Sequence, residues 1–260
     1  SNQTQTLHQF FHDSARSLLP CGRVVVIGRP PEDCQSPRQA TMQRALEGLT
    51  RSLGKELKKG ISVNLVYCAE GAEDQLESTL RFLLSPRSTY VSAQVVRVGK
   101  SSTDTVVTDW ALPLSGKKVL VTGAARGIGA AIAEVLARDG AQLICLDVPA
   151  AQAELDAVVA RLGGRTLAMD IAAIDAPLLL TKEALNDGGW DVLVHNAGIT
   201  RDKTIANMQQ GLWQSVVNIN LSAQERINDA LLEAGALTSG ARIVCVSSIS
   251  GIAGNLGQTN

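Results

Sequence analysis

The sequence predicts an α/β protein built on a doubly wound parallel sheet, and two patterns support this class. Short apolar runs such as Gly22–Gly28 and Ile61–Tyr67 alternate along the chain with longer segments whose apolar residues recur at helical spacing. Strands separated by helices pair in parallel, and parallel strands are buried on both faces, which explains why these runs are mainly apolar. A glycine-spaced turn within Lys118–Gly129 adds a predicted ligand site at this sheet.

The composition argues against several other classes. The chain has 260 residues, enough for one large domain or two small ones, and its 45% hydrophobic content predicts a sizeable core. A net charge of -1 without a basic run argues against nucleic acid as the main partner. No apolar run approaches the roughly 20 residues of a membrane span, and no signal peptide is visible. We therefore expect a cytoplasmic protein with neither a nucleic acid nor a membrane partner.

No metal site is predicted. His8 and His12 are spaced by one turn of an expected helix, which suits a zinc ligand pair, but no third ligand is near them.

The first part of the chain, residues 1–99, shows alternating elements. A proline-rich loop, Arg29–Arg38, interrupts them. Helices are predicted at Leu7–Leu19, Gln39–Lys58 and Gln75–Leu84, and strands at Gly22–Gly28, Ile61–Tyr67 and Gln94–Val98.

Residues 100–115 are polar and irregular and predict a linker, with Trp110 as a candidate packing residue. The alternation restarts at residue 116. The predicted strands are Lys118–Val121, Gln142–Leu146, Thr166–Met169, Val192–His195 and Arg242–Val246. The predicted helices are Gly127–Arg138, Ala151–Leu162, Pro177–Asn186, Met208–Asn218 and Ala223–Ala234.

The segment KVLVTGAARGIG, Lys118–Gly129, has the features of a dinucleotide site. An apolar strand runs into a turn with the spacing T-G-x-x-x-G-x-G, and the turn opens a helix. Glycines let the backbone approach a pyrophosphate, and the helix N-terminus presents free N–H groups and a positive dipole end. Asp147 ends the next strand about 20 residues on, where a carboxylate accepts hydrogen bonds from ribose hydroxyls. The predicted loop residues are Thr122, Gly123, Arg126, Gly127, Ile128 and Gly129.

Over Gly116–Asn260 these motifs resemble those of the short-chain dehydrogenase/reductase family, whose fold is the Rossmann sheet. The resemblance implies that Asp170 and Ile171 lie near the adenine and that Asn196-Ala197-Gly198 contacts the cofactor and stabilises the sheet. It implies NAD(H) or NADP(H) as cofactor. We expect NAD(H) to be preferred, because Asp147 would repel a 2′-phosphate, whereas Arg126 would favour one.

The resemblance also implies a reaction. Ser248 matches the catalytic serine of the family and Asn220, in NINL, its catalytic asparagine. The segments NAGITRDK and SSISGIAGNLGQTN are most similar to those of 3-oxoacyl-[acyl-carrier-protein] reductases. Such enzymes use NAD(P)H to reduce 3-oxoacyl thioesters, on acyl carrier protein or CoA, in fatty acid synthesis. Members of the family are usually homodimers or homotetramers.

One departure from the family pattern is important. The pattern continues with a tyrosine that donates a proton and, four residues later, a lysine that lowers its pKa, and the sequence ends at Asn260, immediately before that tyrosine. The front part aligns with the second half of such a reductase, GRVVVIG against ARIVCVS. In that alignment Gln39 takes the tyrosine position, Gln43 the lysine position, and Arg29 falls near the serine.

These features predict two tandem copies of the fold, of which the first is degenerate: residues 1–99 as the C-terminal half of one copy, and 116–260 as a reductase domain without its C-terminal part. This arrangement resembles the high-molecular-weight reductases of the family, and both ends would then be truncated. An alternative is one permuted domain completed by both halves.

Two other functions stay open. The chain could be a non-catalytic NAD-binding or scaffolding module, or it could act on a different alcohol, such as a 3-hydroxyacyl-CoA.

Overall fold

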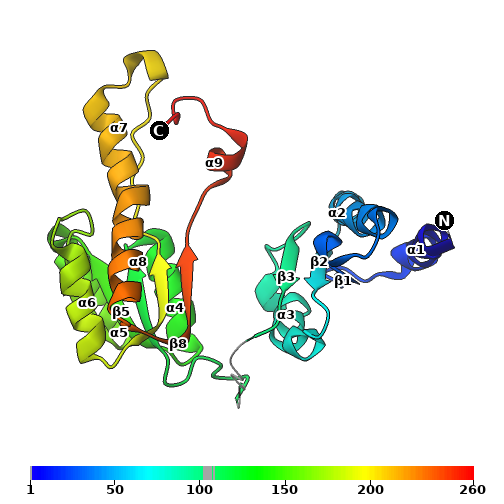
Figure 1. Ribbon diagram of the computed structural model, residues 1–260, viewed down its shortest axis with the longest axis horizontal. Helices are drawn as coiled ribbons and strands as arrows, with labels where there is room; N and C mark the ends of the chain where they lie inside the picture. The colour runs from blue at the N-terminus through cyan, green and yellow to red at the C-terminus, as the bar shows by residue number, and fades with distance from the viewer. Residues whose placement is uncertain (1, 102–106, 108) are drawn as a thin grey trace. The chain divides into compact units, whose positions relative to one another are not determined.

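Figure 1 shows the computed structural model, which describes residues 2–101, 107 and 109–260. The chain divides into two compact units, Ser1–Asp104 and Thr105–Asn260. Residues 102–106 and 108, which belong to the predicted linker, lie outside the described part. The rest of that linker, from residue 112, packs on the second unit, because Leu114 N donates to Asp139 O at 2.9 Å.

The first unit has a three-stranded parallel sheet with the strand order β1-β2-β3. All residues of the central strand are buried. Alternate side chains of this strand point to opposite faces, so Val63 and Leu65 pack with helices α1 and α2, while Val66 and Cys68 pack with α3. The elements are α1 (Asn2–Ser14), β1 (Arg23–Gly28), α2 (Pro37–Glu56), β2 (Ser62–Cys68), α3 (Leu76–Leu83) and β3 (Val95–Val98).

The second unit has a five-stranded parallel sheet in the order β6-β5-β4-β7-β8. The chain runs outward from β4 to β6 and then returns to the other side of β4 for β7 and β8. The strands are β4 (Lys118–Thr122), β5 (Gln142–Asp147), β6 (Arg165–Ala168), β7 (Trp190–His195) and β8 (Leu237–Cys245). The helices are α4 (Gly127–Arg138), α5 (Gln152–Leu162), α6 (Ala176–Asn186), α7 (Gln210–Val217), α8 (Ala223–Glu233) and α9 (Ile249–Ala253).

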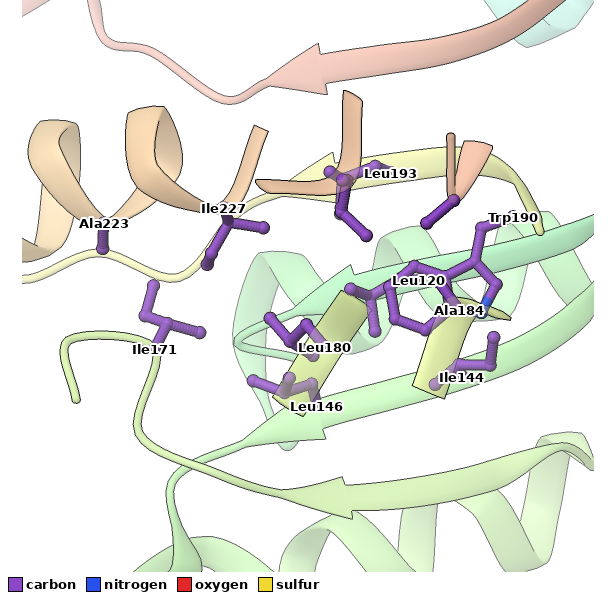
Figure 2. Packing of buried hydrophobic residues seen from close by; sticks show 12 residues of the cluster. Leu120, Ile144, Leu146, Ile171, Leu180, Ala184, Trp190, Leu193, Ala223 and Ile227 are labelled. Atoms are coloured by element: carbon purple, nitrogen blue, oxygen red, sulfur yellow. The ribbon is translucent and has the colours of Figure 1, made fainter. Parts of the chain in front are cut away.

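Helices cover both faces of this sheet, as a doubly wound fold requires. On one face Val119 and Val121 of β4 pack with residues of α4 and α5. On the other face Leu120 packs with residues of α6 and α8. Figure 2 shows this second cluster, in which Trp190, Leu193 and Leu180 surround Leu120 between the strands and the helices. The parallel α/β class is confirmed.

Several element boundaries differ from the expected ones. The first helix ends at Ser14 rather than Leu19, and β8 begins at Leu237, five residues early, with a register shift against β7. Between α7 and α8 the helix continues through a π-helical segment, η7 (Asn218–Ser222), which no periodicity predicted. The five-residue helix α9 was not expected either, because so short a segment has no periodic pattern.

Candidate active site

Apart from Asn220, which lies in η7, the predicted site residues of the second unit lie at or just beyond the carboxyl ends of β4, β5, β6, β7 and β8. β4 is followed by a crossover to β5 on one side, while β7 lies on its other side. The strand order therefore reverses at β4, which is the switch point of the sheet. The connections that follow β4 and β7 leave in opposite directions there and open a crevice between them. The architecture alone therefore makes this edge of the sheet the candidate site.

The glycine loop has the geometry of a close backbone turn. Gly123 and Gly127 have φ angles of +68° and +59°, which side-chain-bearing residues rarely adopt. A Cβ atom at Gly129 would lie 2.0 Å from the carbonyl oxygen of Gly123, so the helix can approach the strand end only through a glycine. Arg126 is the N-cap of α4 and makes no side-chain cap bond. Ile128, in the first turn, is exposed.

Asn196 connects this loop to β7. Its Nδ2 donates to the carbonyl oxygens of Thr122 and Gly123 at 3.1 and 3.2 Å. In return, the backbone N–H groups of Asn196 and Ala197 both donate to Thr122 Oγ1 at 3.0 Å. Thr122 is fully buried. These bonds join the ends of two neighbouring strands, so Thr122 and Asn196 hold the loop against the sheet.

Asp147 contacts the same loop from β5. Its Oδ2 accepts from Ala125 N at 3.0 Å, and its Oδ1 accepts from Val148 N at 2.8 Å. A carboxylate has about four acceptor positions, so two remain for ligand hydroxyls. Asp147 therefore lies beside the glycine loop, in the place that the spacing predicted.

Asp170 and Ile171 follow β6. Asp170 is exposed, and its Oδ1 accepts from Ala172 N at 2.9 Å, which makes a local turn. The Ile171 side chain is buried in the core cluster of Figure 2, so only its backbone is available to a ligand.

The two predicted catalytic residues line one pocket of about 380 Å³. Asn220 lies in the π-helical segment, and π turns occur frequently at functional sites. Its amide is bonded to the backbone of Ile199 in both directions: Oδ1 accepts from N and Nδ2 donates to O, each at 2.9 Å. Ser248 follows β8 and is the N-cap of α9, with Oγ accepting from Ser250 N at 3.2 Å. Its hydroxyl hydrogen is not used in that bond, so Ser248 can still donate to a ligand.

Residues beyond the predicted set complete this pocket. Lys203 N donates to Gly257 O at 2.8 Å, and Gln258 Nε2 donates to Asp202 Oδ1 at 3.1 Å. The segment after β7 is thus paired with residues 255–260, and both line the pocket. A contact between residues so far apart in sequence has no local signal.

The structure fits a dinucleotide in three respects. Gly127 has a positive φ, and a Cβ added there would meet no protein atom within 4 Å, so this part of the loop faces open space in which a pyrophosphate fits. The first turn of α4 has no side-chain cap, and its N–H groups can therefore bind an anion. Asp147 presents free acceptor positions beside that turn.

In the first unit, Gln43 and Arg29, which the alignment placed at the lysine and serine positions, bind to other groups of the protein. Gln43 Oε1 accepts from Arg29 N at 2.9 Å, directly against Gly28. The Arg29 guanidinium pairs with Glu70 and Glu73 at 3.7 and 3.8 Å. A groove of about 700 Å³ does exist in this unit, but it lies between α1 and α2 and is lined mainly by apolar side chains.

Two further features concern metal binding and membrane insertion. Across 2–101, 107 and 109–260, no three His, Cys, Asp or Glu side chains are grouped so that they could hold a metal ion. Within the same ranges no helix combines the length and the apolar character that crossing a membrane needs.

Comparison with known proteins agrees with this geometry. Residues 117–260 match the model of the short chain dehydrogenase family. The chain is 39% identical over 151 residues to a 3-oxoacyl-[acyl-carrier-protein] reductase FabG of Vibrio harveyi, covering 56% of this chain and 61% of that one. It is 40% identical over 148 residues to the Escherichia coli K12 protein of the same name, covering 56% and 60%.

A solved structure is also similar. It is an oxidoreductase, yciK of Escherichia coli, with a TM-score of 0.52 and 26% identity, covering 57% of this chain and 64% of that one. The chain thus spans about 61% of the length of the reductases it matches. With more than half of its residues matched by the family model, the chain belongs to the short-chain dehydrogenase family.

Proposed function

We propose that this protein reduces 3-oxoacyl thioesters to 3-hydroxyacyl thioesters, with hydride supplied by NAD(P)H. One observation carries the proposal: Ser248 and Asn220 line the same pocket, at the edge of the sheet where the glycine loop lies. The similarity to proteins named 3-oxoacyl-[acyl-carrier-protein] reductase supports this choice of substrate, carried on acyl carrier protein or CoA. In the reaction the hydride adds to the carbon of the 3-oxo group, and a proton is added to its oxygen.

Each residue has a definite part in this scheme. The bound cofactor supplies the hydride. The Ser248 hydroxyl donates a hydrogen bond to the substrate carbonyl oxygen, while Ser250 N keeps Oγ oriented. Asn220 fixes Ile199 at the pocket wall and retains one N–H and one acceptor position for a water in the proton relay. In this proposal the proton comes from the tyrosine of the family pattern, whose position follows Asn260, while Ser248 and Asn220, which line the pocket, orient the carbonyl and the relay water.

We further propose that NADH is preferred. Asp147 accepts two backbone bonds and offers its remaining acceptor positions to ribose hydroxyls. A 2′-phosphate at that place would meet the same carboxylate, and juxtaposed like charges cost several kcal/mol. Arg126 is exposed at the N-cap of α4 and leaves NADPH a weaker alternative.

The first unit is, in this proposal, a degenerate copy of the same fold that has a structural role, with 1–99 and 116–260 as the two domains and 100–115 as the linker. The parallel order β1-β2-β3 and the Gln43–Arg29 closure support it. A homodimer or homotetramer is the expected assembly.

The test compares Ser248→Ala with Ser247→Ala in the full-length protein. Ser247 is the adjacent exposed residue and does not line the pocket, so it controls for local changes. Loss of one donor to the developing oxyanion is expected to lower kcat by about 10²–10³-fold, with NADH affinity unchanged. Normal turnover by Ser248→Ala would remove Ser248 from the reaction.

Two other outcomes separate the alternative functions. NADH binding without reduction of any ketone would favour a binding module. Faster turnover of simple ketones than of 3-oxoacyl thioesters would indicate a different alcohol dehydrogenase.

A further inference from the structure

His195, the last residue of β7, has a fully buried side chain. Its Nε2 lies 2.8 Å from Oδ1 of Asn228 on α8. Because an amide oxygen only accepts, Nε2 carries the hydrogen, and Nδ1 is then a bare acceptor. Nδ1 is buried and has no hydrogen-bond partner in the part of the chain that the structure describes. Burial lowers the pKa of this imidazole, which keeps the ring neutral at neutral pH.

A buried acceptor without a partner is unfavourable, and a leucine or methionine would fill similar space without one. The imidazole therefore needs a compensating role. Its bond to Asn228 is a polar link between β7 and α8, in an interface where Leu193, Ile227 and Leu231 make apolar contacts. Apolar contacts alone tolerate sliding and rotation of a helix, whereas a single buried hydrogen bond selects one position.

The backbone around His195 reaches the other parts of the site. The His195 carbonyl accepts from Val246 N at 2.8 Å, two residues before Ser248. The next residue, Asn196, holds the glycine loop. On the helix, Asn228 lies about two turns after Asn220, within the continuous helical run formed by α7, η7 and α8.

We propose that His195 is a positioning residue of the active site. Through Asn228 it sets the height and rotation of the helix that carries Asn220, relative to the strand ends that carry Ser248 and the glycine loop. The inference rests on the reductase function proposed above. Among the described residues, the hydrogen bonds of His195 go to Asn228 and Val246 and not to Ser248 or Asn220, so His195 acts through the elements that carry those two residues.

The test uses His195→Leu and His195→Gln in the full-length protein. Leucine removes the bond to Asn228, whereas the glutamine side chain places an amide N–H where Nε2–H was. Asn228→Leu removes the same bond from the helix side and serves if His195→Leu does not fold. Thr181→Ala is the matched control, because Thr181 is a buried hydroxyl on α6 that bonds only locally, to Pro177 O.

Four quantities are measured: kcat and KM with acetoacetyl-CoA and NADH, the Kd of NADH, and the rate of hydrogen exchange at the Ile199 amide, which donates to Asn220 Oδ1. We expect His195→Leu to lower kcat by about 10–100-fold, since a shift of about 1 Å in a positioned group has effects of that order. KM and the Kd of NADH should change by less than about threefold, and Ile199 exchange should accelerate at least about tenfold. His195→Gln should restore most of kcat, and Thr181→Ala should lower Tm without changing kcat.

Two results would overturn the inference. One is wild-type kcat together with wild-type Ile199 exchange in His195→Leu. The other is a His195→Gln variant as impaired as His195→Leu, which would indicate a packing role only. If the wild-type protein reduced no 3-oxoacyl thioester, the proposed function would fail. Ile199 exchange would still decide the positioning role, since unchanged protection in His195→Leu refutes it and accelerated exchange supports it.

Discussion

Replacing Asp147 by alanine separates the proposed cofactor-selecting role of this carboxylate from its structural role. The structure assigns it two backbone bonds, to Ala125 N at 3.0 Å and to Val148 N at 2.8 Å. Loss of the bond to Ala125 loosens the glycine loop and weakens the binding of NADH and NADPH alike. Loss of the bond to the ribose weakens the binding of NADH alone, and removal of the negative charge strengthens the binding of NADPH.

The expected magnitude follows from the number of bonds lost. One hydrogen bond between a hydroxyl and a charged group is worth roughly 1.5–3 kcal/mol, which corresponds to about 10–150-fold in Kd. The ratio of the Kd of NADPH to the Kd of NADH should therefore fall by at least about 10-fold in Asp147→Ala. Because the loop effect is common to both cofactors, it cancels in this ratio.

The assay is a fluorescence titration of both cofactors with wild type, Asp147→Ala and Arg126→Ala. Arg126→Ala is the opposing control: it should leave NADH binding within about threefold and weaken NADPH, because it removes the positive charge that favours a phosphate. An unchanged ratio in Asp147→Ala would refute the assignment of this carboxylate to the ribose.

Four further predictions concern the glycine loop, helix α7, the buried imidazole and the core. Gly129→Ala should lower the free energy of unfolding by about 1–3 kcal/mol and abolish NADH binding, because the new Cβ would lie 2.0 Å from a backbone oxygen. Gly211→Ala, in α7 with open space around the new Cβ, should instead raise stability by about 0.5–1 kcal/mol in the same denaturant titration. His195 has a lowered pKa in the folded state, so the unfolded chain binds the additional proton more readily. The contribution of neutral His195 to stability is therefore present above pH 6.5 and is lost as the pH falls below that value. In His195→Gln this part of the pH dependence of Tm should be lost. Trp190→Ala should cost about 3–5 kcal/mol in denaturant titrations, because Trp190 is fully buried in the core cluster of Figure 2.

Local patterns predicted the elements well where the residues that decide them are close in sequence. The helix Gly127–Arg138 was predicted to the residue, because the glycine turn fixes its start and its apolar face is regular. The glycine turn before it was predicted for the same reason, whereas its binding of a cofactor stays a prediction. By contrast, β8 begins at Leu237 because pairing with β7 after a register shift extends it, and no local pattern reports such pairing.

The site was less predictable where distant residues meet. The amide of Asn220 is hydrogen-bonded to the backbone of Ile199. In the first unit Gln43 accepts a hydrogen bond from Arg29 N. In both pairs the two residues are far apart in the sequence. The importance of His195 depends on Asn228, which is on another element. A buried imidazole with one bare nitrogen cannot be recognised from the letters HNAG, because burial and partners arise only when the sheet and helix pack.

The most direct test of the central claim follows the hydrogen atom. Full-length protein is incubated with acetoacetyl-CoA and NADH deuterated at the transferring position, and the product is examined by mass spectrometry. The account predicts one 3-hydroxybutyryl-CoA per NADH consumed, with deuterium on carbon 3, and product formation about 10²–10³-fold slower with Ser248→Ala. NADH that binds but is not consumed with this or any other 3-oxoacyl thioester would contradict it.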